Sequence, residues 1–141
     1  KTRMKVSDAT ESDFVIGLAV LDTAAIAADG DGVTDGIFFQ KDDGSTTVTF
    51  QCQKNATTGQ VRDADVATMV ADTYVSLGFE YDGVSSVRAF VNDVHVGTLD
   101  LGTTPSAYFP DTPITLTMAF LAGTTSIVTM TVDYIFAAQE R

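Results

Sequence analysis

The chain has 141 residues, of which 45% are hydrophobic and 19% are charged, and its formal net charge is −11 at pH 7. This length suits one domain with a hydrophobic core, so a single domain over residues 1–141 is predicted. Nineteen acidic side chains against eight basic ones repel phosphate backbones and anionic lipids. The composition disfavours nucleic acid as a partner. No apolar run approaches the roughly 20 residues that span a bilayer, so no membrane span is predicted.

The first half of the chain alternates apolar and polar residues with the two-residue period of strands. Phe14–Leu21 is apolar on both faces, which predicts a strand that is covered on both sides. The turn residues Asp42-Asp43-Gly44 predict a hairpin. The span Lys54–Ala71 is read either as an extended edge around Val61–Val70 or as a short irregular segment. The strands predicted in this half are Thr2–Val6, Phe14–Leu21, Ile37–Lys41 and Thr46–Gln53.

The second half contains three consecutive predicted strands, Thr73–Tyr81, Ser86–Val91 and Val94–Leu99. Turns at Asp82-Gly83 and Asn92-Asp93 connect them, because Asp, Asn and Gly tolerate the left-handed backbone of tight turns. Ile114–Leu121 follows a proline-containing loop and alternates cleanly. The last predicted strand places a set of apolar residues on its inner face and threonines on its outer face: Val128, Met130, Val132, Tyr134 and Phe136 inside, Thr129 and Thr131 outside.

About eight such strands, with threonine and β-branched residues abundant, favour an all-β fold. Two stacked antiparallel sheets accommodate them without a helix. The fold class predicted from the pattern is therefore a two-sheet antiparallel sandwich.

The meander resembles the central strands of concanavalin A-like (laminin G-like) jelly rolls. The resemblance rests on Tyr81-Asp82-Gly83, Val87–Asp93 and Val94–Gly97, although Asn92-Asp93 stands where those domains commonly have Asn-Gly or Asp-Gly. The segments Phe14–Leu21, Asp35–Phe39 and Val132–Arg141 are similar to jelly-roll domains of tailed-phage virion proteins. The resemblance covers nearly the whole chain.

The resemblance implies a non-enzymatic structural protein on the capsid surface of a phage virion. Among these proteins, the chain is most similar to a capsid decoration (cement) protein, which implies the major capsid protein as its partner. A homo-oligomer is expected, with a trimer favoured. The alternative is a carbohydrate-binding, lectin-like module of a phage fibre or tail. The resembling domains carry one or two further strands before the position of Lys1, so the chain is expected to lack them.

The loop from Asp29 to Gly36 is the best candidate for a metal site. Asp29, Asp31 and Asp35 could offer carboxylate oxygens to calcium. The spacing is not that of an EF-hand, because Thr34 and Gln40 stand where such a loop needs glycine and glutamate. Aspartate and glycine also gather in ordinary turns, so a solvated loop without metal is the preferred reading and no cofactor is predicted.

The chain contains few candidates for catalytic residues. Glu80 and Asp82 are the nearest match to the carboxylate pair of a glycosidase, but Glu80 lies on the polar face of its strand and Asp82 in a turn. A catalytic dyad or triad with a histidine base would have to use His95, the single histidine, and its cysteine nucleophile would be Cys52. Neither residue stands in a recognisable motif, so no catalytic residue is predicted.

Sugar binding usually requires aromatic side chains that stack on the ring. The chain has no tryptophan, and Tyr74, Tyr81 and Tyr108 are the available aromatics. We expect these tyrosines to lie in the core or in an interface.

Overall fold

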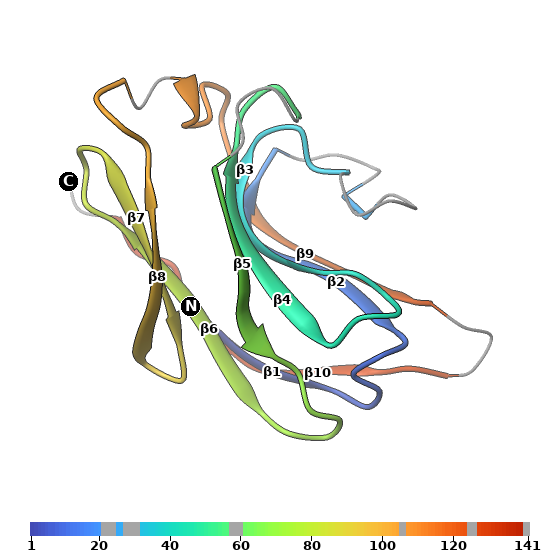
Figure 1. The fold of residues 1–141 in the computed structure, drawn as a ribbon. Coiled ribbons are helices and arrows are strands. Elements are labelled where there is room, and N and C mark those ends of the chain that lie inside the picture. Colours follow the sequence, from blue (N-terminus) through green and yellow to red (C-terminus); the bar gives the residue numbers. More distant parts are fainter. Residues whose placement is uncertain (21–24, 27–31, 57–60, 105–106, 124–126, 140–141) are drawn as a thin grey trace.

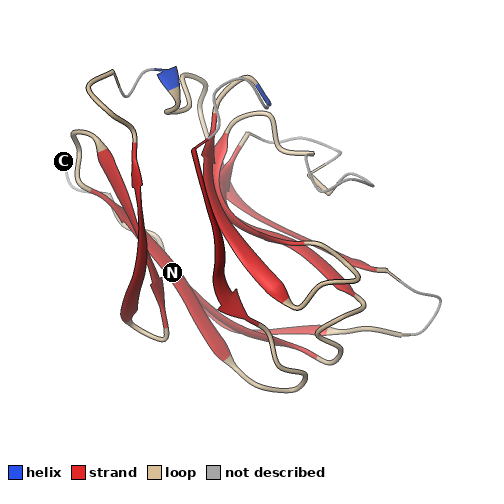
Figure 2. Ribbon diagram, viewed as in Figure 1, coloured by secondary structure: helices blue, strands red, loops and turns tan. Residues whose placement is uncertain are grey.

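A computed structural model describes residues 1–20, 25–26, 32–56, 61–104, 107–123 and 127–139. These residues form ten strands and no α-helix (Figures 1 and 2). The strands are β1 Thr2–Val6, β2 Ser12–Ala19, β3 Gly36–Lys41, β4 Thr47–Gln53, β5 Val61–Thr68, β6 Val75–Tyr81, β7 Ser86–Val91, β8 Val94–Asp100, β9 Thr115–Ala122 and β10 Met130–Ile135.

Two five-stranded sheets pack face to face (Figure 1). One has the order β10-β1-β6-β7-β8 and the other the order β5-β4-β3-β2-β9, and all paired strands are antiparallel. The prediction of an all-β fold with two antiparallel sheets is confirmed, and the arrangement is consistent with a jelly-roll sandwich. The structure has ten strands where about eight were predicted.

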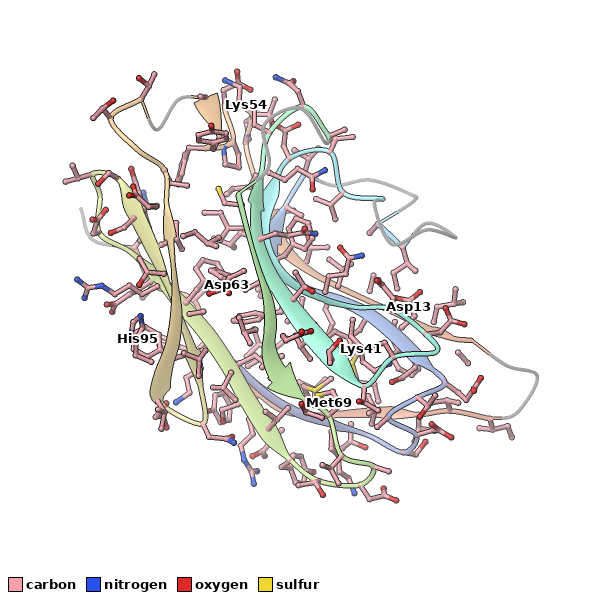
Figure 3. All side chains as sticks on the ribbon, in the orientation of Figure 1. Asp13, Lys41, Lys54, Asp63, Met69 and His95 are labelled. Carbon is pink, nitrogen blue, oxygen red and sulfur yellow. The ribbon has the colours of Figure 1, made fainter. Side chains whose placement is uncertain are left out.

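The core lies between the sheets, where the inner faces of both contribute apolar side chains (Figure 3). Phe39 and Phe50 are at most 1% exposed, and their ring centroids lie 4.7 Å apart. Phe79 reaches them from the opposite sheet, 5.7 Å from the Phe50 ring. Offset aromatic contacts of this kind add about 0.5–1.5 kcal/mol to the burial of their area.

The predicted meander is present as β6, β7 and β8. Asn92 and Asp93 have φ values of 50° and 67°, the left-handed conformation that a two-residue hairpin turn requires. The Asn92 side chain also accepts a hydrogen bond from the backbone N–H of Ser76, with 2.9 Å between donor and acceptor. This contact holds the turn against the neighbouring strand.

The ambiguous span Lys54–Ala71 contains an edge strand, β5, so the extended reading is correct. Asp63 of β5 lies opposite Phe50 and faces the inside of the sandwich near Gly97 of β8 (Figure 3). A Cβ atom at position 97 would overlap the Asp63 carboxylate, so this close approach requires glycine. The register of β5 also shifts between Val48 and Phe50. An inward charge and a bulge are devices that keep an edge strand from pairing with another chain.

The predicted inner face of the last strand is only partly correct. Its register with β1 shifts between Arg3 and Met4, so Val132 lies opposite Met4 while Tyr134 lies opposite Arg3. Asp133 is the extra residue of this bulge, and it reverses the alternation after Val132. Tyr134 therefore lies on the outer face, which contradicts the prediction. Phe136, also predicted to be inside, is 62% exposed.

Candidate functional site

The candidate site is an apolar cleft between the two sheets. Its volume is about 280 Å³. The edge strand β9 of one sheet and the C-terminal end of β10 of the other line its mouth. Leu77 and Phe79 of β6 line the opposite wall. The side chains that dominate the lining are Ile16, Leu77, Phe79, Leu116, Met118, Ile135 and Phe136.

β9 faces the cleft with every second residue. Leu116, Met118 and Phe120 lie opposite Leu18, Ile16 and Phe14 of β2, so these side chains all point to the interior of the sandwich. Leu116 is nevertheless 49% exposed. The reason is its position on an edge strand, because no strand of the described chain lies beyond β9 to cover it.

The C-terminal side of the mouth forms what we term the apolar rim, residues 135–137. Ile135 is 41% exposed and Phe136 is 62% exposed. Backbone hydrogen bonds fix the rim, because the N–H of Phe136 donates to the carbonyl of Lys1 at 2.7 Å and the Lys1 amino group donates to the carbonyl of Phe136 at 2.8 Å. The exposed aromatic ring thus stands on an anchored backbone.

Most of the described basic side chains are neutralised by ion pairs. Five of the lysine and arginine side chains that the structure describes form ion pairs with carboxylates, and Lys41 donates to backbone carbonyl oxygens instead. The pairs are Lys1–Asp93, Arg3–Asp133, Lys5–Asp72, Lys54–Asp111 and Arg88–Glu80. The remaining carboxylates determine the sign of the surface, which agrees with the net charge of −11.

Asp13 and Lys41 form a buried charged cluster at the other end of β2 and β3 (Figure 3). Burial is the main cause that raises the pKa of Asp13 to about 6, and the nearby carboxylates Asp42 and Asp43 raise it further. Burial also lowers the pKa of Lys41. The Lys41 ammonium donates to three backbone carbonyl oxygens, those of Thr10, Ser12 and Asp42. The Asp13 Oδ1 atom is buried and has no hydrogen-bond donor among the described residues.

The predicted calcium ligands are only partly placed. Asp29 and Asp31 lie outside the described residues. Asp35 is 6% exposed and accepts a hydrogen bond from the backbone N–H of Asn55 at 3.3 Å. Among the described residues, no three side chains of the His, Cys, Asp and Glu types gather into a group that could hold a metal ion.

Glu80 and Asp82 have structural contacts. Glu80 pairs with Arg88 across the hairpin at 3.2 Å. The Asp82 carboxylate accepts hydrogen bonds from the Ser86 hydroxyl and from three backbone N–H groups in the turn that it begins. These bonds hold the pKa of Asp82 well below its usual range, and the bond from the Ser86 hydroxyl has the largest effect. A carboxylate held in this way stabilises the turn and is a poor proton donor.

Cys52 and His95 do not form a pair. Cys52 is fully buried between the sheets, and burial raises the pKa of its thiol to about 12. His95 is exposed on the outer face of the other sheet, where a ring nitrogen lies 2.9 Å from the Thr98 hydroxyl (Figure 3). A thiol with this pKa supplies almost no thiolate at neutral pH.

The three tyrosines are dispersed, and each contacts other side chains. The Arg3 guanidinium lies 4.2 Å from the centroid of the Tyr74 ring. The Tyr81 ring is 4.6 Å from that of Phe109, and Tyr108 packs against the core. Tyr108 therefore packs on the core as expected, whereas Tyr74 and Tyr81 are 36% and 37% exposed and do not lie in the core. Their expected place in an interface stays a prediction.

Alternation predicted the apolar face of β9 and part of the apolar face of β10, but not the cleft between these strands. Alternation shows which residues face inward, whereas the opening depends on which strands lie at the sheet edges. Comparisons of the chain with family models, curated proteins and solved structures found no match. Within the described residues, no helix is long and apolar enough to cross a bilayer.

Proposed function

We propose that this protein is a non-enzymatic structural protein of a phage virion, a capsid decoration protein whose partner is the major capsid protein. The observation that carries the proposal is the apolar rim beside the 280 Å³ cleft. Exposed aromatic and aliphatic groups on a fixed backbone are typical of protein–protein contact surfaces. The virion assignment itself rests on the resemblance of the strands to phage jelly-roll domains.

The contacts of the candidate catalytic residues support a role without chemistry. Glu80 forms an ion pair with Arg88, and the Asp82 carboxylate accepts hydrogen bonds within its turn. Cys52 is buried in the core. Catalytic groups instead need access to a substrate and a pKa near the working pH. An inert sandwich with one apolar contact surface meets the needs of a decoration protein.

Sedimentation of the protein with phage heads that lack it tests the proposal. We expect saturable binding with a fixed ratio to the capsid subunit. Phe136→Asp should weaken the binding at least about tenfold, because it places a charge at the centre of an apolar contact. Val84→Asp is the matched control, since Val84 is 69% exposed in the turn between β6 and β7 and should leave the binding unchanged.

If the protein does not sediment with the heads and is specifically retained on a glycan surface, the proposal is contradicted and the lectin-like alternative is favoured. Equal head binding by Phe136→Asp and the unmodified protein would contradict the role of the apolar rim.

A further inference from the structure

The sandwich has four edge strands, and one of them differs from the others in charge. β5 contains Asp63 and Asp65, β8 contains Asp100, and β10 contains Asp133. β9, with the sequence TLTMAFLA, contains no charged residue. It also contains no proline and is eight residues long. Charges, prolines and bulges are what keep edge strands from pairing with other chains, and β9 has none of them.

The other edge strands carry features that hinder pairing with another chain. β5 has a register shift against β4, and its inward carboxylate, Asp63, lies beside Gly97 of β8. β10 has its own bulge at Asp133, whose carboxylate pairs with Arg3 at 2.6 Å. The pairing of β9 with β2 is regular over all eight residues, from Ser12–Ala122 to Ala19–Thr115. β9 therefore presents an uninterrupted set of backbone groups at the edge of its sheet.

We propose that β9 pairs antiparallel with β9 of a second copy of this chain and joins the two β5-β4-β3-β2-β9 sheets into one continuous sheet. This inference concerns self-association and does not depend on the capsid role. The alternation of β9 suits a second copy of itself, because Leu116, Met118 and Phe120 share the inner face and match in an antiparallel self-pair. Charge restricts where that copy can approach. Each copy carries −11, so two copies can approach closely only along a neutral surface, and β9 is the neutral edge that the described chain provides.

The side-chain alternation restricts the register of this pairing. Residues directly opposite each other must lie on the same face of a sheet, so an inner residue of one β9 must meet an inner residue of the other. The register that pairs Met118 with Met118 of the second copy meets this condition. It also places Leu116 opposite Phe120 of the second copy, which covers a side chain that is 49% exposed in the single chain. On the outer face, Thr117 meets Ala119.

The geometry predicts a dimer with twofold symmetry, because a strand that pairs antiparallel with itself uses the same surface on both copies. A trimer, the oligomer expected from the resemblance, would need two different surfaces. Sedimentation equilibrium should show a reversible complex of twice the 14.9 kDa chain mass.

Thr117→Lys should raise the dissociation constant of the dimer at least about tenfold, because it places a cation in the centre of the new strand pair. Thr115→Lys, at an exposed position near the end of β9, should also weaken the dimer if Thr117→Lys folds poorly. Thr68→Lys is the matched control. Thr68 is an exposed threonine on β5, the far edge strand of the same sheet, and its replacement should leave the dimer intact.

Cysteine cross-linking reports the register independently. An equimolar mixture of Thr117→Cys and Ala119→Cys should give a covalent heterodimer under mild oxidation, whereas each variant alone should cross-link much less. Cys52 does not interfere, because it is buried and its thiol pKa is about 12. Three results would overturn the proposal: a monomer at every concentration, a trimer, or a dimer that both lysine variants on β9 leave unchanged.

Discussion

Asp13 is a carboxylic acid that folding places in an unfavourable environment. It is 6% exposed, and its Oδ1 atom has no donor among the described residues. The protonated form is favoured there, so the native state binds a proton more tightly than the unfolded chain does. The pKa rises from 3.8 to about 6, and the stability contributed by the protonated form is therefore full below about pH 4 and is lost as the pH rises through about 6.

Asp13→Asn should remove this dependence. We expect the difference in melting temperature between the variant and the unmodified protein to grow in favour of the variant from about pH 4 to about pH 6.5 and to stay constant above. Glu80→Gln, which changes an exposed acid in an ion pair, is the control and should show no such growth. A constant difference for Asp13→Asn across this range would contradict the assigned pKa.

The acidic loop offers a second prediction at the scale of single residues. Asp35 accepts a hydrogen bond from the backbone N–H of Asn55, and its own backbone carbonyl accepts one from Val20. These contacts give Asp35 a structural role without metal. We expect chelation by EDTA to leave the melting temperature unchanged. A clear decrease with EDTA that is absent in Asp31→Ala would show that the loop binds calcium, because a ligand bound only by the native state stabilises it.

At the scale of the strands, the apolar alternation and the turn residues were sufficient to predict most elements. Ser86–Val91 has the predicted bounds, and the turn at Asn92-Asp93 has the predicted left-handed backbone. β5 was harder to identify because Arg62, Asp63 and Asp65 interrupt its apolar pattern. The bulge at Asp133 was not predictable, since an extra residue in one strand becomes visible only against the partner strand β1.

The inner and outer faces of β10 before the bulge permit a sharp test. Met130 packs against the core and lies opposite Val6, which is fully buried, whereas Thr131 lies opposite Lys5 on the outer face. Met130→Asp should lower the free energy of unfolding by about 3 kcal/mol, because it buries an unpaired carboxylate. Thr131→Asp should change it by less than about 1 kcal/mol. Equal melting temperatures for the two variants would mean that the faces are assigned wrongly.

The candidate site was less predictable than the strands. The alternation of Ile114–Leu121 indicated which of its side chains share a face, but Leu116 is inward-facing and still 49% exposed. Its exposure depends on the strand order, which places β9 at an edge. A sequence pattern gives the direction of a side chain relative to its own strand. It does not show whether a neighbouring strand covers that side chain.

For the whole molecule, charge should determine the response to salt. The chain carries −11, and five of the basic side chains that the structure describes are already paired with carboxylates. Two copies therefore repel each other, and salt screens this repulsion over a Debye length of about 10 Å at 0.1 M. We expect the dimer to become tighter as NaCl rises from about 0.05 M to about 0.5 M, measured by sedimentation equilibrium. Weakening of the dimer by salt would show that opposite charges hold it together.

Head binding should respond in the opposite direction if the capsid contact is basic, because an acidic protein is attracted to a surface of opposite charge and salt screens that attraction. Measuring both equilibria over the same range of salt distinguishes the two surfaces without any substitution.

The pairing of the first strand with the last has a mechanical consequence. Thr2 of β1 lies opposite Ile135 of β10, and Lys1 and Phe136 exchange backbone hydrogen bonds beside them, so the beginning and the end of this strand pair lie at the same end of the ladder. A force that pulls the two ends of the chain apart would load these bonds one after another, as in a zipper, instead of shearing all of them at once. The sandwich should therefore yield to tension at low force when it is stretched through its ends, although the side chains of its core are buried between the sheets.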